Sequence, residues 1–210
     1  MKKLIPILLA VFALASCEKD PDMGKLDDNY LVYTNYDKQA NFKDFSTFYL
    51  ADKILVISDS KEPEYLEGEG AEQILAAYTD NMIARGYAAA TNKESADLGI
   101  QVSYIASTYY FTGYTQPEWW WGYPGYWGAS YWGNWGGWYY PYAVTYSYST
   151  NSFLTEMVNL KAEQGDSKKL PVVWTSYLTG FETGSKAINR TLAVEAVNQS
   201  FTQSPYLTNK

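Results

Sequence analysis

Cys17 is the residue whose type and surroundings point most directly to chemistry. It is the only cysteine of the 210-residue chain, and it follows Leu14-Ala15-Ser16 at the end of an apolar run that begins at Leu4 behind two lysines. A run of about 12 apolar residues is shorter than the ~20 needed to cross a bilayer, but it has the length of a signal-peptide core. The pattern predicts a bacterial lipobox, in which residues 1–16 form the signal peptide and the Cys17 thiol takes the lipid. The alternative is an ordinary secretory signal with a chance cysteine.

The absence of histidine limits the other chemistry of the chain. Without His there is no Ser-His-Asp or Cys-His nucleophile and no imidazole acid or base near neutral pH. A single Cys allows no internal disulfide and no zinc site built from several cysteines. We therefore expect no catalytic residue, no metal and no cofactor, and a protein that is not an enzyme. The remaining enzymatic alternative is a hydrolase that uses a pair of carboxylates.

Two short motifs resemble catalytic or nucleotide-binding signatures. Ser58-Asp59-Ser60-Lys61 fits the S-x-x-K pattern of penicillin-recognising enzymes, but the companion motifs of those enzymes are missing. Gly68-Glu69-Gly70 resembles a dinucleotide-binding loop, but Gln73 replaces the third glycine and the neighbouring glutamates would repel a pyrophosphate. We interpret the first motif as chance and the second as a turn that enters a helix.

Charge and the residues after Cys17 favour a tethered protein of the cell envelope. Loss of residues 1–16 removes two of the 16 basic residues and leaves 14 against 23 acidic ones, so the net charge becomes −9. Such a surface disfavours nucleic acid as a partner. Residues 17–28 are largely polar, which predicts a flexible tether between lipid and domain. The expected location is the outer membrane, on its periplasmic or its surface-exposed side.

Hydrophobic spacing predicts the elements of the remaining chain. Strict alternation at Leu98–Tyr104 indicates a strand. Apolar residues at helical spacing over Ala71–Met82, with Gly86 beyond them, indicate a helix. A second helix opens at Gly184-Ser185 and ends before Pro205. The other expected strands are Tyr30–Tyr36, Thr47–Leu50 with Ile54–Ile57 as an extension, Val144–Ser149, Leu154–Leu160 and Val172–Leu178.

These elements predict one α+β domain at residues 29–210. We expect a single mixed, largely antiparallel sheet of five or six strands, with two helices packed on one face. The first helix would join two parallel strands in a β-α-β crossover, and the last three strands would form an antiparallel meander. A long insert rich in Gly, Trp and Tyr, residues 109–142, interrupts the domain.

Several short motifs, in the order of these elements, resemble one family of bacterial lipoproteins. The motifs are Phe42-Lys43-Asp44-Phe45, Arg85-Gly86-Tyr87, Ala96-Asp97-Leu98, Val172-Val173-Trp174 and the closing helix with Phe201. The chain from Tyr30 to Pro205 is similar to the family called domain of unknown function 4136. Lys161 and Thr175-Ser176 depart from the family pattern, which has an Asp at the first position and a basic residue with Gly at the second. The resemblance implies the fold and the targeting of the chain as a lipoprotein, and it implies no activity.

The insert at residues 109–142 contains 17 aromatic residues, seven of them Trp. Its glycines make the backbone adaptable, while Trp and Tyr offer rigid apolar faces with one polar group each, as binding loops do. We expect at least part of the insert to form an exposed apolar patch, the alternative being hairpins that enlarge the core. The candidate binding surface consists of Trp119, Trp120, Trp121, Tyr123, Tyr126, Trp127, Tyr131, Trp132, Trp135 and Trp138.

The sequence thus predicts a lipid-anchored interaction module. The Cys17 lipid would hold the protein on the membrane, and the insert would bind a protein partner or a second copy of the chain. Sugar rings also stack on Trp and Tyr, so the alternative is a carbohydrate-binding or carbohydrate-processing accessory lipoprotein. The border of the outer leaflet is a third environment that suits these side chains. We also expect that replacing Gln116–Tyr139 with a short Gly/Ser linker leaves the fold intact.

Overall fold

The computed structural model describes residues 30–58, 60, 62–106, 137–142, 151–163, 169–181 and 186–210. The lipobox with Cys17, the tether, most of the insert and the strand expected at Val144–Ser149 lie outside these residues. None of the helices in the described part of the chain has the length and apolar character needed to cross a membrane.

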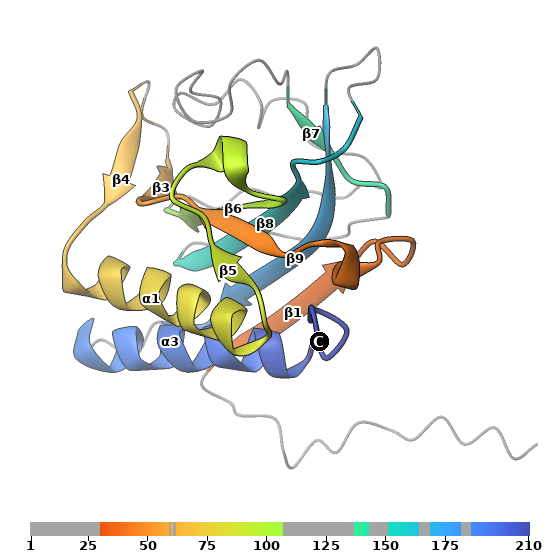
Figure 1. The fold of residues 1–210 in the computed structure, drawn as a ribbon. Coiled ribbons are helices and arrows are strands. Elements are labelled where there is room, and N and C mark those ends of the chain that lie inside the picture. Colours follow the sequence, from red (N-terminus) through yellow and green to blue (C-terminus); the bar gives the residue numbers. More distant parts are fainter. Residues whose placement is uncertain are drawn as a thin grey trace, which may run out of the picture.

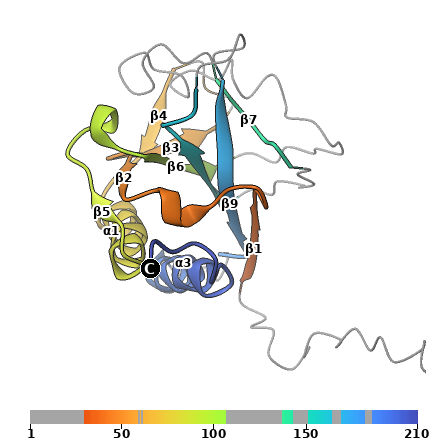
Figure 2. The same cartoon turned by 45° about the vertical axis from the view of Figure 1, so that its right-hand side comes forward.

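The domain is built on one large mixed sheet, shown from two sides in Figures 1 and 2. Its main path runs in the order β1-β9-β8-β6-β2-β5, with β3 also pairing with β6, β4 with β3, and β7 with β9. The strands are β1 Leu31–Tyr36, β2 Thr47–Leu50, β3 Ile54–Ile57, β4 Glu64–Leu66, β5 Ala88–Ala89, β6 Leu98–Ile105, β7 Trp138–Tyr139, β8 Ser152–Asn159 and β9 Leu170–Thr179. Two short 3-10 helices occupy Phe42–Asp44 and Lys93–Ser95.

The predicted α+β class is confirmed, but the expected number of strands was too low. The described residues form nine strands, against the five or six expected. The additional strands β4, β5 and β7 are only two or three residues long, so they show no alternation that a sequence pattern could reveal. Ile54–Ile57 is also a strand of its own, since β2 pairs with β6 near Ile100 and β3 pairs further along it near Tyr104.

The predicted crossover connection is present. Helix α1, Glu69–Ala84, lies between β3 and β6 in the chain, and both β2 and β3 pair with β6 in parallel. On the other side, β8 pairs antiparallel with β6 and β9, and β9 pairs antiparallel with β1. Two strands of the predicted meander are therefore confirmed, while the third lies outside the described residues.

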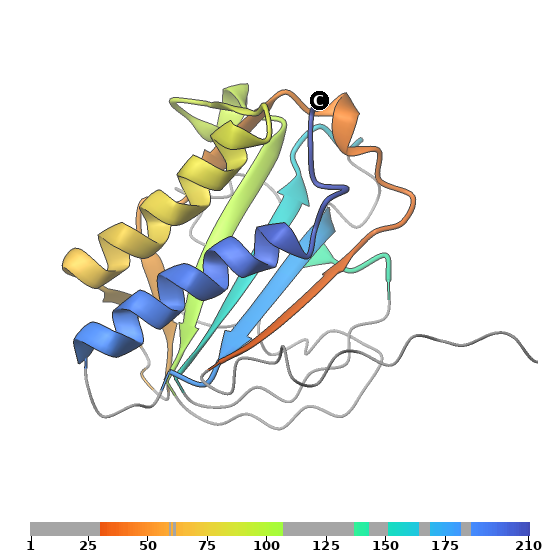
Figure 3. The ribbon, with the colours of Figure 1, turned by 90° about the horizontal axis from the view of Figure 1, so that it is seen from below.

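Helices α1 and α3, Lys186–Thr202, lie side by side across the same face of the sheet, as predicted (Figure 3). Ala71, Ile74, Tyr78 and Met82 form the buried stripe of α1, because residues three and four apart share a helix face. Gly86 follows the helix with φ +98°, a left-handed conformation that favours glycine, and its N–H donates to the Ile83 carbonyl.

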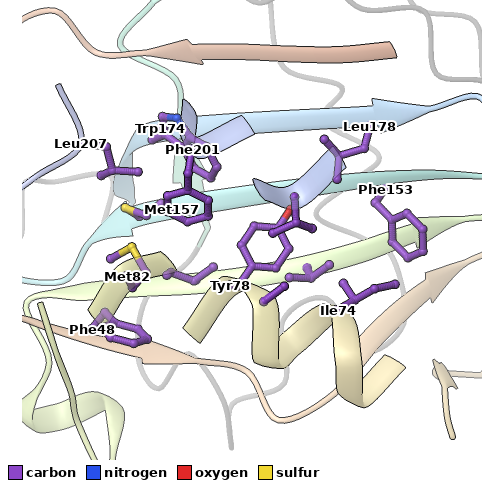
Figure 4. Packing of buried hydrophobic residues seen from close by; sticks show 14 of the residues in the cluster. Phe48, Ile74, Tyr78, Met82, Phe153, Met157, Trp174, Leu178, Phe201 and Leu207 are labelled. Carbon is purple, nitrogen blue, oxygen red and sulfur yellow. The ribbon is translucent and has the colours of Figure 1, made fainter. Parts of the chain in front are cut away.

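The core lies between the helices and this face of the sheet (Figure 4). Trp174 of β9 is fully buried, and its Nε1 donates to Ser204 Oγ at 2.9 Å. The hydroxyl of the fully buried Tyr78 accepts a hydrogen bond from Thr155 Oγ1 at 2.6 Å. Each of these polar atoms has a partner inside the core, which offsets the cost of removing it from water.

Candidate functional sites

Trp138 is the one residue of the predicted binding surface that the structure describes. It lies in β7, which pairs in parallel with β9 on the side of the sheet away from the helices (Figure 2). Its side chain is 1% exposed, and its Nε1 donates to Glu156 Oε1 at 3.1 Å. Its placement on an exposed surface was therefore wrong: Trp138 is packed against the sheet. The other nine residues of that surface lie outside the described residues.

Glu156 of β8 is a buried carboxyl that the sequence analysis did not single out. Its neighbours Thr155 and Met157 face the helices, so by strand alternation Glu156 points to the opposite face. The hydroxyl of Tyr140 also donates a hydrogen bond to Oε1 of Glu156. Burial raises the pKa of Glu156 well above its ordinary value, because a charged carboxylate is costly in a dry environment.

A row of polar side chains crosses the sheet at Glu156. Gln101 of β6 and Thr175 of β9 are its direct partners in the strand register, and both are buried. The row combines a carboxyl, an amide and a hydroxyl with the nearby Trp138 and Tyr140 rings. The chemistry suits hydrogen bonding, but these groups are removed from solvent. The presence of a charged residue, Glu156, within the predicted strand is a signal that could have indicated this site. The alternation of that strand does not show, however, that the face carrying Glu156 is covered by other residues.

A second site is a cavity of about 730 Å³ at the start of both helices. Tyr104 of β6 and Phe153 of β8, which are paired in the strand register, contribute rings to it, as does Phe181, two residues after the end of β9. The first turns of α1 and α3 close the cavity from the helix side, with Ile74 and Ala193 as buried apolar contributions. Its volume is typical of small-molecule sites. No sequence motif predicted it, because its walls come from segments far apart in the chain.

Charged and amide side chains surround this cavity. Arg190 Nη1 of α3 lies 2.8 Å from Glu69 Oε2 of α1, so the pair joins the first turns of the two helices. Glu67, Lys186 and Asn189 also line the cavity. The cavity therefore has an apolar interior and a lining that carries both signs of charge.

Of the two short motifs singled out in the sequence, Gly68-Glu69-Gly70 contributes Glu69 and Gly70 to the cavity lining, whereas Ser58 and Ser60 are not among the lining residues. Ser58 Oγ donates to Glu64 Oε2 at 2.8 Å, and Lys61 lies outside the described residues. Gly68 precedes α1 with φ +91°, which agrees with the interpretation of that motif as a helix-entry turn. Among the residues that the structure describes, no group of three or more His, Cys, Asp or Glu side chains could hold a metal ion.

The motifs behind the family resemblance hold the fold together. Arg85 Nη1 donates to the carbonyls of Ser204 at 2.7 Å and Leu207 at 3.0 Å, and Nη2 donates to that of Phe201. Arg85 thus joins the end of α1 to the last turn of α3 and the segment that follows it. Tyr87, from the same motif, donates its hydroxyl to the Phe42 carbonyl at 3.1 Å.

Asp97, from another of these motifs, fixes the start of β6 against β2. Its Oδ2 accepts from the backbone N–H groups of Ser46 at 2.6 Å and Thr47 at 3.1 Å, and Oδ1 lies 3.5 Å from Lys161 Nζ. Burial favours the neutral form of Asp97, but the two backbone hydrogen bonds and Lys161 outweigh it and lower its pKa. Lys161, a departure from the family pattern, therefore has an electrostatic role here.

The fold places the chain among α+β domains with two helices on one face of a mixed sheet. The chain belongs to the family described as Domain of unknown function (DUF4136), whose model matches residues 32–206. It is similar to the crystal structure of a DUF4136 family protein from Bacteroides thetaiotaomicron, with 92% identity and a TM-score of 0.78, covering 88% of this chain and 100% of that one. A PelC dodecamer from Paraburkholderia phytofirmans matches with 11% identity and a TM-score of 0.40, covering 86% and 99%. No curated protein matches the chain.

Proposed function

We propose that the chain is a lipid-anchored protein of the outer membrane that acts, without catalysis, as an interaction module. The observation that carries the proposal is the lipobox, in which the only Cys of the chain follows a cationic start, a short apolar run and two small residues. Lipid on Cys17 would anchor the protein without a transmembrane helix. The tether at residues 17–28 would then connect the lipid to β1, which begins at Leu31.

The attachment of the insert to the sheet supports an interaction role. At its C-terminal side, Trp138 and Tyr139 pair with β9, and Trp138 and Tyr140 donate hydrogen bonds to Glu156. A segment fixed at its base to a packed sheet orders fewer residues when it binds, and so loses less entropy. The partner in this proposal is a protein or a second copy of the chain, bound by the aromatic side chains of residues 109–136.

Lipidation is tested by labelling cells with radioactive palmitate. The native chain should be labelled and recovered with membranes. Cys17→Ala should lose the label and leave the membrane fraction, because the chain has no other thiol that could accept the lipid. A label that persists in Cys17→Ala would overturn the lipobox assignment.

The interaction role is tested by replacing part of the insert. A Gly/Ser linker in place of Gln116–Trp135 removes nine of the eleven aromatic residues in the segment Gln116–Tyr139. It keeps Tyr139 and the buried Trp138. Sedimentation and pull-down from native membranes should show loss of self-association or of a protein partner. Unchanged association in a folded variant would contradict this part of the proposal.

Carbohydrate binding is the second candidate function. The observation in its favour is the aromatic composition of residues 109–142, because sugar rings stack on the faces of Trp and Tyr. The polar row at Glu156 does not contribute to this candidate, because Glu156, Gln101 and Thr175 are buried. Titration with envelope polysaccharides should then shift the Trp fluorescence of the native chain. Unchanged fluorescence together with a captured protein partner would favour the interaction module.

A further inference from the structure

The cavity at the start of α1 and α3 has an interior suited to an apolar molecule. Its rings form a connected row, since the centroids of Tyr104 and Phe153 lie 5.2 Å apart and those of Phe153 and Phe181 lie 5.8 Å apart. Phe153 and Phe181 are each 5% exposed, and Ile74 and Ala193 line the cavity beside them. Because these side chains are already largely buried, the gain comes chiefly from the apolar part of the ligand, which is stabilised by about 25 cal/mol for each Å² of its surface removed from water.

The polar lining of the cavity favours an anionic group at one end of that ligand. The charges of Lys186 and Arg190 balance those of Glu67 and Glu69, and Glu69 is already paired with Arg190 at 2.8 Å. Both helices begin at the cavity, and each helix start contributes the equivalent of about half a positive charge. The side-chain charges and the charges of the two helix starts therefore add up to a positive net charge at this end of the cavity. Lys186, in the first turn of α3, is exposed and suitably placed to approach an anion at the mouth.

We propose that this cavity binds a single-chain amphiphile with an anionic head group, of the fatty-acid class. The tail lies on the Tyr104–Phe153–Phe181 row, and the carboxylate lies at the helix starts beside Lys186. Asn189, which also lines the cavity, adds an amide within the first turn of α3. A volume of about 730 Å³ accommodates a ligand of this size.

The probe for this site is laurate, below its micelle-forming concentration, on the unlipidated chain from Glu18 onward. A shorter chain of the family folds, since the similar crystal structure covers 88% of this chain. Calorimetric titration should show one laurate bound per chain. Dodecyltrimethylammonium, which has the same tail and a cationic head, should bind about tenfold or more weakly. Equal binding of the two amphiphiles, or no binding of laurate, would overturn the proposal.

Two variants locate the binding. Lys186→Glu changes an exposed residue at a helix start, where an acidic side chain is compatible with folding, and it should weaken laurate binding about tenfold. Lys38→Glu makes the same charge change on the turn after β1 and should leave binding unchanged. Ala193→Leu fills the interior and should reduce binding in a chain that still melts cooperatively. Equal weakening by Lys186→Glu and Lys38→Glu would show a surface-charge effect and overturn the assignment to the cavity.

Discussion

Trp174 and Trp138 are buried on opposite faces of the same sheet, and their surroundings differ. Each is at most 1% exposed, and each donates its Nε1 to a side-chain oxygen, at 2.9 Å for Trp174 and 3.1 Å for Trp138. Trp174 belongs to a ten-residue strand and bonds to the neutral hydroxyl of Ser204 beyond the end of α3. Trp138 belongs to a two-residue strand and bonds to Glu156, a carboxyl whose pKa is raised by burial.

The difference shows two ways of covering a sheet. The helix-covered face is held by an extensive apolar cluster, and the polar atoms of Tyr78 and Trp174 within it bond to neutral hydroxyls. We therefore expect the stability of this face to depend little on pH. In the part of the opposite face that the structure describes, a short segment is fixed through one ionisable group. We expect the first face to carry most of the free energy of unfolding and the second to respond to pH.

Trp174→Ala should have the largest effect. It removes a fully buried ring that packs against Phe201 at a centroid distance of 5.5 Å and leaves Ser204 without its indole partner. Loss of such a ring costs about 3–5 kcal/mol of unfolding free energy. Chemical denaturation followed by far-UV circular dichroism measures it. A loss below about 1 kcal/mol would contradict the central role of the helix-covered face.

Trp138→Ala should cost less, about 1–3 kcal/mol. The ring is as deeply buried as that of Trp174, but β7 pairs only through Trp138 and Tyr139, so the segment opens without unfolding the sheet. Limited proteolysis should therefore increase near residues 137–142 before the melting temperature falls strongly. If Trp138→Ala destabilised the protein more than Trp174→Ala, the ranking of the two faces would be wrong.

Glu156→Gln should change the pH dependence of stability. The unfolded chain releases this proton near the ordinary pKa of 4.5, whereas the folded chain keeps it to higher pH, so its contribution to stability is full below 4.5 and is lost as pH rises through the raised folded pKa. Gln keeps an acceptor for Trp138 and Tyr140 and cannot ionise. The variant should stay within about 1 kcal/mol of the native chain at low pH and lose stability less steeply on going to neutral pH.

Asp97→Asn provides the contrasting measurement. The pKa of Asp97 is lowered from 3.8, so its contribution is present above that value and is lost as pH falls through the folded pKa. The two variants should therefore alter the stability curve in opposite directions across the acidic range. If the unfolding free energies of Glu156→Gln and of the native chain changed with pH in parallel, this result would contradict a neutral, buried Glu156.

Replacement of Gln116–Trp135 by a short Gly/Ser linker should have the smallest effect on stability. Loop length changes the closure entropy by less than about 1 kcal/mol, and the buried Trp138 is retained. The wider replacement of Gln116–Tyr139 also removes the buried Trp138, so its effect on stability should resemble that of Trp138→Ala. We therefore expect only the narrower replacement to leave stability nearly unchanged. Equal melting temperatures for the two replacements would show that Trp138 contributes nothing to the sheet.

Local patterns by themselves determined the elements with enough residues to repeat. The alternation of Leu98–Tyr104, the helical stripe from Ala71 to Met82 and the glycine at position 86 predicted β6, α1 and the end of α1. These patterns are reliable because burial on one face of a strand or helix requires apolar residues at a fixed spacing. Order along the chain also predicted the parallel crossover, and the family motifs predicted the fold.

Only the tertiary structure decided which distant segments meet. The partners of Glu156 come from β6, β9 and the segment after β7, and the cavity brings together Phe153, Phe181 and the starts of two helices. Strand alternation places Glu156 on one face of β8, but it does not tell whether that face is wet or covered. Burial depends on side chains that arrive from elsewhere in the sequence, so the raised pKa of Glu156, the burial of Trp138 and the cavity all follow from packing rather than from local spacing.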